Sequence, residues 1–226
     1  MLFLVSAQLI VFCAAKLSQA GTWREDFEDR MEDEWQISNP NRRVEKWWVD
    51  DGEAVGEIFQ PGFMSVWLTG NLNWQNYSVS CRSKLVEEKE EPGTVGLTLH
   101  NREGGGSRYL FILAPTLGIV RIIRVAPEGL FIFTFPFVTE LNRWYQLKAS
   151  ISEEIMQFRI DDKVFLGRDL NPLAGGKAGL LVSNAQARFD DIEISGSNIK
   201  NGGPGRARSI TKRRILTKVW ANLRKH

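Results

Sequence analysis

Short apolar runs with a two-residue period, separated by turn residues at roughly ten-residue spacing, constrain the fold of this chain more than any other feature. In the clearest run, Tyr77, Val79 and Cys81 alternate with Ser78, Ser80 and Arg82. Successive side chains of a β-strand point to opposite faces, so this run buries one face of a sheet and exposes the other. Similar runs cover residues 22–27, 47–49, 54–58, 65–68, 94–100, 108–114, 118–125, 130–137, 144–151, 156–160, 164–166, 178–182 and 187–194. No long helical period interrupts them, which predicts an all-β, antiparallel β-sandwich with two facing sheets.

The turns between the runs indicate which strands are neighbours. Asp161 and Asp162 separate two apolar runs, and short Asx side chains tolerate the backbone angles of a two-residue hairpin. Gly104, Gly105 and Gly106 join the runs at 94–100 and 108–114. We therefore expect each of these two pairs of runs to form adjacent antiparallel strands.

The first 20 residues have the pattern of a signal peptide. An apolar run from Leu2 to Ala15 precedes Ser18-Gln19-Ala20, which has small residues at the two positions that signal peptidase reads. No positive residue precedes the run, which leaves an uncleaved anchor as the alternative. No later segment approaches the roughly 20 apolar residues of a transmembrane helix. We predict a protein that is secreted or extracytoplasmic, in the periplasm or at the cell surface.

The remaining chain divides into a body and a basic tail. The body, residues 21–196, is long enough for one hydrophobic core, and Cys81 is its only cysteine, so no internal disulfide can stabilise it. Residues 197–209 are rich in Gly, Asn and Ser and predict a flexible linker. Residues 210–226 place apolar side chains at helical spacing among basic ones, which is typical of a short basic amphipathic helix.

Charge is distributed unevenly between these parts. Nine of the 29 Lys and Arg residues follow Glu193, whereas all 27 acidic residues lie at or before it. The body therefore carries a net charge of about −8. The tail is expected to attract an anionic membrane surface or an acidic polysaccharide; nucleic acid is the least favoured partner of an exported protein.

The order of elements resembles the concanavalin A-like lectin/glucanase superfamily, which includes laminin-G-like domains and the jelly-roll domains of glycoside hydrolase family sixteen. The matching pieces are 25–29, 48–53, 74–79, 143–148, 158–163 and 189–194. The resemblance implies a jelly roll whose first and last strands are adjacent, and a concave face on which many members bind glycans.

Catalysis through the motif of that family is not expected. A retaining glycosidase needs two carboxylates about 5 Å apart, and the family supplies them from a Glu-x-Asp-x-x-Glu strand that this sequence lacks. The only histidines are His100 and His226, and these two residues are too few to predict a Cys/His nucleophile pair or a zinc cluster. No catalytic residue is therefore assigned.

Glycan binding requires aromatic rings beside planar polar groups. The candidates for the concave face are Trp67, Arg82, His100, Tyr109 and Phe111, with packing in the core as the alternative for the aromatic ones.

The resemblance also implies a structural calcium ion that ties the first strand, a Gly-bearing turn and the last strand together; here the matching residues are Glu25, Gly52 and Asp190. Exposed acidic residues without a metal are the alternative.

The sequence thus predicts a secreted, non-catalytic carbohydrate-binding or adhesion module whose partner is a glycan or polysaccharide. Two other functions stay open. One is a glycoside hydrolase or lyase with an unrecognised site on the concave face, and the other is a structural domain for protein interaction.

Overall fold

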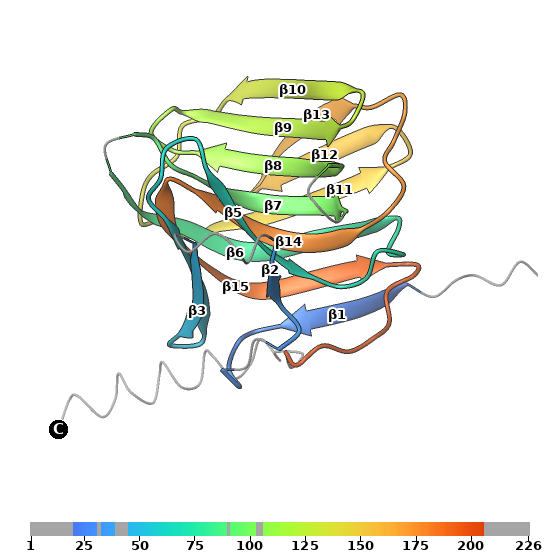
Figure 1. Cartoon of the computed structure of the whole chain (residues 1–226), viewed down its shortest axis with the longest axis horizontal. Helices are drawn as coiled ribbons and strands as arrows, with labels where there is room; N and C mark the ends of the chain where they lie inside the picture. Colours follow the sequence, from blue (N-terminus) through green and yellow to red (C-terminus); the bar gives the residue numbers. More distant parts are fainter. Residues whose placement is uncertain (1–19, 31–32, 39–44, 90, 103–105, 206–226) are drawn as a thin grey trace, which may run out of the picture.

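The computed structural model describes residues 20–30, 33–38, 45–89, 91–102 and 106–205, and in them two antiparallel sheets pack face to face (Figure 1). The eight-stranded sheet contains β1 (Gly21–Glu25), β3 (Lys46–Asp50), β4 (Glu53–Ile58), β6 (Tyr77–Glu88), β11 (Tyr145–Ser152), β12 (Ile155–Ile160), β13 (Lys163–Arg168) and β15 (Ala185–Gly196). The seven-stranded sheet contains β2 (Gln36–Ile37), β5 (Met64–Thr69), β7 (Thr94–Asn101), β8 (Arg108–Ala114), β9 (Ile119–Ala126), β10 (Gly129–Pro136) and β14 (Lys177–Ser183).

The strand order follows the turns that the sequence predicts. The eight-stranded sheet runs β13-β12-β11-β6-β15-β4-β3, with β1 on β15, and the seven-stranded sheet runs β10-β9-β8-β7-β14-β5-β2. Asp161 and Asp162 close the hairpin of β12 and β13, where Ile160 pairs with Lys163. The strands on either side of the glycine run, β7 and β8, are also neighbours. The predicted all-β sandwich is therefore confirmed, and no helix occurs among the described residues.

Every apolar run of the sequence corresponds to a strand, but the sequence pattern does not predict β2. β2 has only two residues, and it pairs with Leu68 and Trp67 of β5. Two residues are too few for an alternating pattern to be recognised. The longest strands, β6 and β15, extend beyond the predicted runs because they pair with each other at the centre of the eight-stranded sheet.

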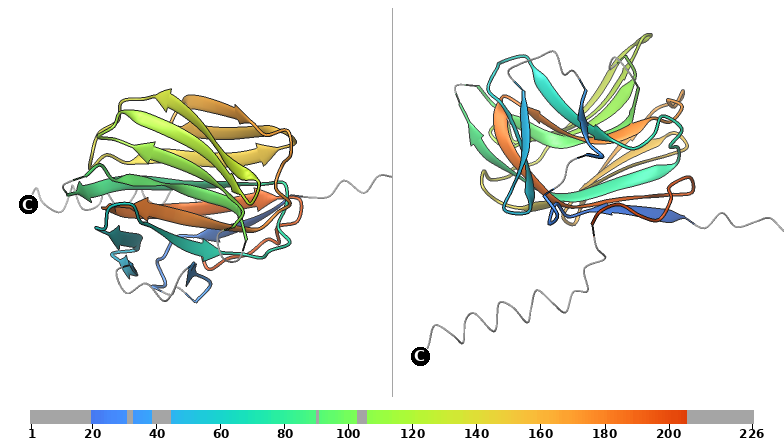
Figure 2. Two further views of the ribbon diagram at one scale, coloured as in Figure 1. Left: turned by 45° about the horizontal axis from the view of Figure 1, so that its top comes forward. Right: turned by 60° about the horizontal axis from the view of Figure 1, so that its bottom comes forward.

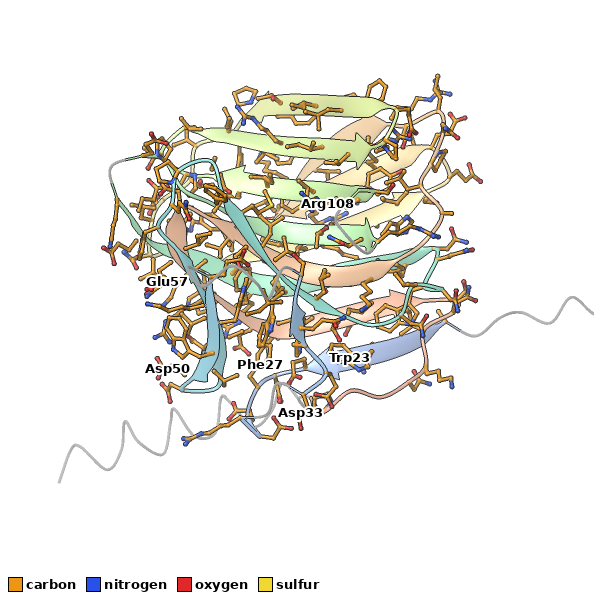
Figure 3. The ribbon with its side chains drawn as sticks, in the orientation of Figure 1. Trp23, Phe27, Asp33, Asp50, Glu57 and Arg108 are labelled. Atoms are coloured by element: carbon orange, nitrogen blue, oxygen red, sulfur yellow. The ribbon has the colours of Figure 1, made fainter. Side chains whose placement is uncertain are left out.

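The core lies between the sheets, and one end of it is a stack of aromatic rings. Trp67 of β5 lies between Trp35 and Trp47, with ring centroids 4.9 and 5.2 Å away. The indole ring of Trp47 can lie against the backbone of Gly56, its register partner, because glycine has no Cβ. A Cβ at that position would come within 2.6 Å of the ring. The indole nitrogen of Trp47 donates to the hydroxyl of Ser65 at 2.7 Å. Phe27, labelled beside β1 in Figure 3, stacks on the same Trp67 ring.

The two ends of the body meet at the edge of the eight-stranded sheet. β1 pairs antiparallel with β15, Gly21 opposite Gly196, so the first and last strands are adjacent as expected. Part of the predicted linker follows the other side of β1: the N–H of Arg24 donates to the carbonyl of Gly202, and the side chain of Ile199 is buried. The predicted signal peptide and the basic tail lie outside the described residues, apart from Ala20. No helix long and apolar enough to cross a membrane occurs in the described ranges.

Candidate functional site

The outer face of the eight-stranded sheet carries a cluster of polar side chains around one tryptophan. We call it the Arg82 cluster; it consists of Arg82, Lys84, Trp144, Asp190 and Asp191. Tyr145 and Leu147 of β11 point into the core, so the preceding Trp144 lies on the outer side, where it is half-buried. The guanidinium of Arg82 lies 4.7 Å from the Trp144 ring centroid, and the ammonium of Lys84 lies 4.8 Å from it.

Two consecutive aspartates reach the same guanidinium because β15 is irregular at this point. The register of β15 against β6 shifts between Asp190 and Glu193, and Asp191 has a φ of 53°. Arg82 consequently pairs with Asp190 and also with Asp191, whose Oδ2 lies 3.0 Å from Nε. The hydrogen bond and the charge of Asp190 raise the pKa of Arg82 against the opposing effect of burial. The cluster is thus an aromatic ring beside a planar cation held by two carboxylates.

A second polar row crosses the same face. Arg188 of β15 lies between Lys84 of β6 and Val55 of β4 in the register, and it pairs with Glu53 and Asp50. Trp48 is the register partner of Val55 and also lies on the outer side, since Trp47 points inward. Figure 3 labels Asp50 at this edge. On the outer face of the eight-stranded sheet, ion-paired side chains thus lie between two half-buried tryptophans, Trp48 on the edge strand β3 and Trp144 directly before β11.

The outer face of the seven-stranded sheet has the opposite chemistry. Aliphatic side chains form a separate buried cluster there, composed of Val66, Leu68, Leu110, Ile112, Ile123 and Leu181. None of the seven strands contains an aspartate or a glutamate. Arg108 of β8 lies on this face, labelled in Figure 3, and burial lowers the pKa of its guanidinium. These strands cannot supply the two carboxylates that a glycosidase needs.

A buried polar network joins the two sheets at the opposite end from β3. The hydroxyl of Tyr109 donates to Asp169 at 2.6 Å, and the Nε of Arg124 lies 2.7 Å from the same oxygen. The N–H of Leu173 donates to the Tyr109 hydroxyl, while His100 Nδ1 donates to the carbonyl of Leu173 at 3.0 Å. Burial and the bond to Asp169 raise the pKa of Tyr109. This network attaches the 169–176 connection to the seven-stranded sheet.

The five residues predicted to bind a ligand do not share one face. Trp67, Tyr109 and Phe111 point into the core between the sheets, which was the stated alternative for aromatic residues. His100 has a φ of 52°, and this irregularity at the end of β7 turns its ring toward Tyr77 and Tyr109, away from the outer side of Thr98. Arg82 alone lies on an outer face, and that face belongs to the other sheet. Sequence reasoning missed Trp144, although the alternation of residues 144–151 places it on the outer side.

His100 gives the stability of the fold a pH dependence. Burial lowers its pKa from the ordinary value of 6.5, so below that pH the unfolded chain takes up a proton that the folded chain does not. The contribution of His100 to stability is full above pH 6.5 and is lost as the pH drops toward the folded-state pKa, by at most about 1.4 kcal/mol per pH unit for one proton. Glu25, whose pKa is raised by burial to about 7, has the opposite pH dependence, so the slope due to His100 is the difference between wild type and variant. In chemical denaturation between pH 5 and 8, the variant His100→Gln should lose the slope that His100 contributes. His226→Gln, the matched control, should retain it; equal slopes in His100→Gln and the wild type would contradict the assignment.

The residues matched to the calcium ion have other neighbours. Glu25 is buried, accepts hydrogen bonds from the Phe27 N–H and the Trp35 indole, and has its pKa raised to about 7, mainly by burial. Asp190 pairs with Arg82, and Gly52 lies beside the carboxylate of Glu28. Within the described ranges no three His, Cys, Asp or Glu side chains form a group that could hold a metal. The calcium ion therefore stays a prediction.

Comparison with known proteins extends the description of the fold. No protein-family model matches the sequence, and a search of curated proteins gave no match. Among solved structures, a Bacillus subtilis carbohydrate-binding module, CBM66, is 15% identical with a TM-score of 0.58, over 71% of this chain and 94% of that one. A Bacillus licheniformis β-glucanase is 10% identical with a TM-score of 0.60, over 77% and 97%. The CBM2 module of an evolved Dit protein from Lactobacillus casei BL23 phage J-1 is 9% identical with a TM-score of 0.55, over 80% and 99%.

These likenesses are likenesses of fold. The chain has the concanavalin A-like lectin/glucanase jelly-roll fold, which carbohydrate-binding modules and glycoside hydrolases share. Fold alone does not determine which of these functions a chain performs.

Proposed function

We propose that this protein is a non-catalytic glycan-binding module and that the glycan binds at the Arg82 cluster. The observation that carries the proposal is the half-buried Trp144 beside the ion-paired Arg82 on an exposed sheet face. An indole ring provides an apolar surface for the face of a sugar ring, while guanidinium and carboxylate groups bind sugar hydroxyls. Carbohydrate-binding modules among the structural neighbours support the same function.

The chemistry of the cluster favours a neutral or mixed-charge glycan. Arg82 and Lys84 are balanced by Asp190 and Asp191, so no strong net charge attracts a polyanion. The predicted export places such a module where polysaccharides are found. The basic tail, which lies outside the described residues, would add an attraction to anionic surfaces, and this attraction would weaken as the salt concentration rises.

Polysaccharide binding measured by calorimetry tests the proposal. Trp144→Ala should weaken the binding of any glycan found on an array by at least about fivefold, since aromatic stacking alone contributes roughly 1 kcal/mol. Trp48→Ala is the matched control, because it removes a half-buried tryptophan from the far side of the same sheet face. Unchanged affinity in Trp144→Ala would move the site elsewhere, and no glycan binding at millimolar concentration would refute the function.

The hydrolase alternative gains no support from the seven-stranded sheet, whose strands carry no carboxylate. On the other sheet, the aspartates of the Arg82 cluster are engaged with Arg82. A reducing-sugar assay on the same samples separates the two functions, because binding without sugar release agrees with a binding module. Release of sugar that a single carboxylate substitution abolishes would establish the hydrolase.

A further inference from the structure

β10 leaves one edge of the seven-stranded sheet open. It pairs with β9 over its whole length, Gly129 opposite Ala126 to Pro136 opposite Ile119, without any shift in register. No described strand pairs with its other side. A free strand edge presents unpaired N–H and C=O groups to any strand that can align with it.

The other edges of the two sheets are protected, whereas β10 is not. β13 begins with Lys163 and ends with Arg168, and β3 begins with Lys46 and ends with Asp50. β2 has two residues, and residues up to Gly205 cover β1. Short length, charged side chains and covering segments are the devices that prevent edge-to-edge pairing. β10 has no charged residue and no bulge, no described strand covers it, and its one protective residue, Pro136, stands at its last position.

The side chains of β10 are exposed and apolar. Leu130, Phe131 and Ile132 are 59, 55 and 50% exposed. Soluble proteins rarely expose neighbouring large apolar side chains without a partner. Val164 and Leu166 of β13 are also exposed, but they belong to the edge strand of the opposite sheet; Figure 2 shows the two sheets facing each other.

The inner side of β10 is firmly supported. Phe133 lies over Gly167 of β13, where a Cβ would come within 2.9 Å of its ring, and Phe135 and Phe137 pack on Phe165 at 5.4 and 5.3 Å. These contacts join β10 to the edge strand of the opposite sheet. These contacts therefore hold the open edge in place as an extended strand.

We infer that β10 pairs antiparallel with β10 of a second copy of this chain about a two-fold axis, so that the two seven-stranded sheets become continuous. A two-fold axis places the same surface on both sides of an interface. With the axis near the middle of β10, Ile132 or Phe133 lies opposite its own copy. Opposite residues of a sheet point to the same side, so apolar side chains contact apolar ones along the strand. An uncharged edge strand leaves a monomer open to nonspecific pairing. In a dimer the same lack of charge is favourable, because no like charges of the two β10 strands face each other.

Sedimentation of the full chain over a range of concentrations tests this inference. The wild type should form dimers, and Ile132→Lys should raise the dimer dissociation constant at least roughly 100-fold, because like charges directly opposite in a sheet are destabilising and here would also be desolvated. Val138→Lys is the matched control, since Val138 is 87% exposed and follows the end of β10; it should leave the dimer intact. A wild type that is monomeric at every concentration, or a dimer that Ile132→Lys leaves unchanged, would overturn the inference.

Cysteine cross-linking then tests the register. In a chain carrying Cys13→Ser, either Ile132→Cys or Phe133→Cys, whichever residue lies at the two-fold axis, should form an intermolecular disulfide on mild oxidation, while Val138→Cys should not. Cys81 is buried and does not interfere. Equal cross-linking at both positions would show association through another surface and would contradict the β10 pairing.

Discussion

Replacing Asp169 with alanine should lower the free energy of unfolding by about 3–5 kcal/mol, because it leaves a buried cation without its buried partner. The side chain of Arg124 is 2% exposed, and that of Asp169, its ion-pair partner, is 8% exposed. Asp169 also accepts the hydroxyl hydrogen bond of Tyr109 and the N–H of Asn171. The variant thus removes the acceptor at the centre of the network that attaches the 169–176 connection. Urea denaturation at pH 7 measures the loss.

Two further variants separate a buried charge from simple loss of packing. Asp162→Ala changes an exposed aspartate at a hairpin turn and should shift stability by no more than about 0.5 kcal/mol. Replacing Arg124 and Asp169 together with leucine should be less destabilising than Asp169→Ala, because no unpaired charge is left in the core. A loss below about 1 kcal/mol in Asp169→Ala would mean that Glu128, the other ion-pair partner of Arg124, compensates alone.

Ending the chain after Gly196 should cost roughly 3 kcal/mol or more, whereas ending it after Gly205 should leave stability nearly unchanged. The shorter chain loses the burial of Ile199, which is 5% exposed and contributes about 2–3 kcal/mol. It also loses the hydrogen bonds that Asn201, Gly202 and Gly205 make with Thr22 and Arg24 of β1. Thermal melts of the two truncated chains and the full chain compare these effects.

Ile199→Ala in the full chain separates the side-chain contribution from chain length. It should lose about 2–3 kcal/mol, because it leaves a cavity at the core and keeps the backbone hydrogen bonds of the segment. Equal stability of the chains ending at Gly196 and Gly205 would show that the whole segment after β15 is a linker, as the composition of residues 197–209 predicts.

The strands could be predicted because their signal is local, whereas the site depends on distant pairings. Alternation in residues 77–82 correctly places Tyr77, Val79 and Cys81 in the core and Arg82 outside. The partner of Arg82, however, lies 108 residues away, and only the pairing of β6 with β15 brings it near.

Irregular backbone marks a second limit of sequence reasoning. Strict alternation predicts that His100 shares the outer side of Thr98, but a positive φ at the end of β7 turns it inward. The same kind of irregularity in β15 brings Asp191 beside Asp190 at one guanidinium. Asn, Asp and His adopt positive φ more often than other non-glycine residues, but a single sequence does not show which of them will do so. The inward turn of His100 and the position of Asp191 both arise at such residues.

The aromatic stack around Trp67 gives the protein a built-in optical reporter. Indole rings separated by 4.9 and 5.2 Å couple electronically, so Trp35, Trp67 and Trp47 should absorb and emit light as an interacting set. Because Trp47 belongs to β3 of the eight-stranded sheet and Trp67 to β5 of the seven-stranded sheet, the coupling of these two rings exists only while both sheets are assembled. Far-ultraviolet exciton circular dichroism would therefore follow the docking of the sheets, and it would do so separately from the formation of individual hairpins.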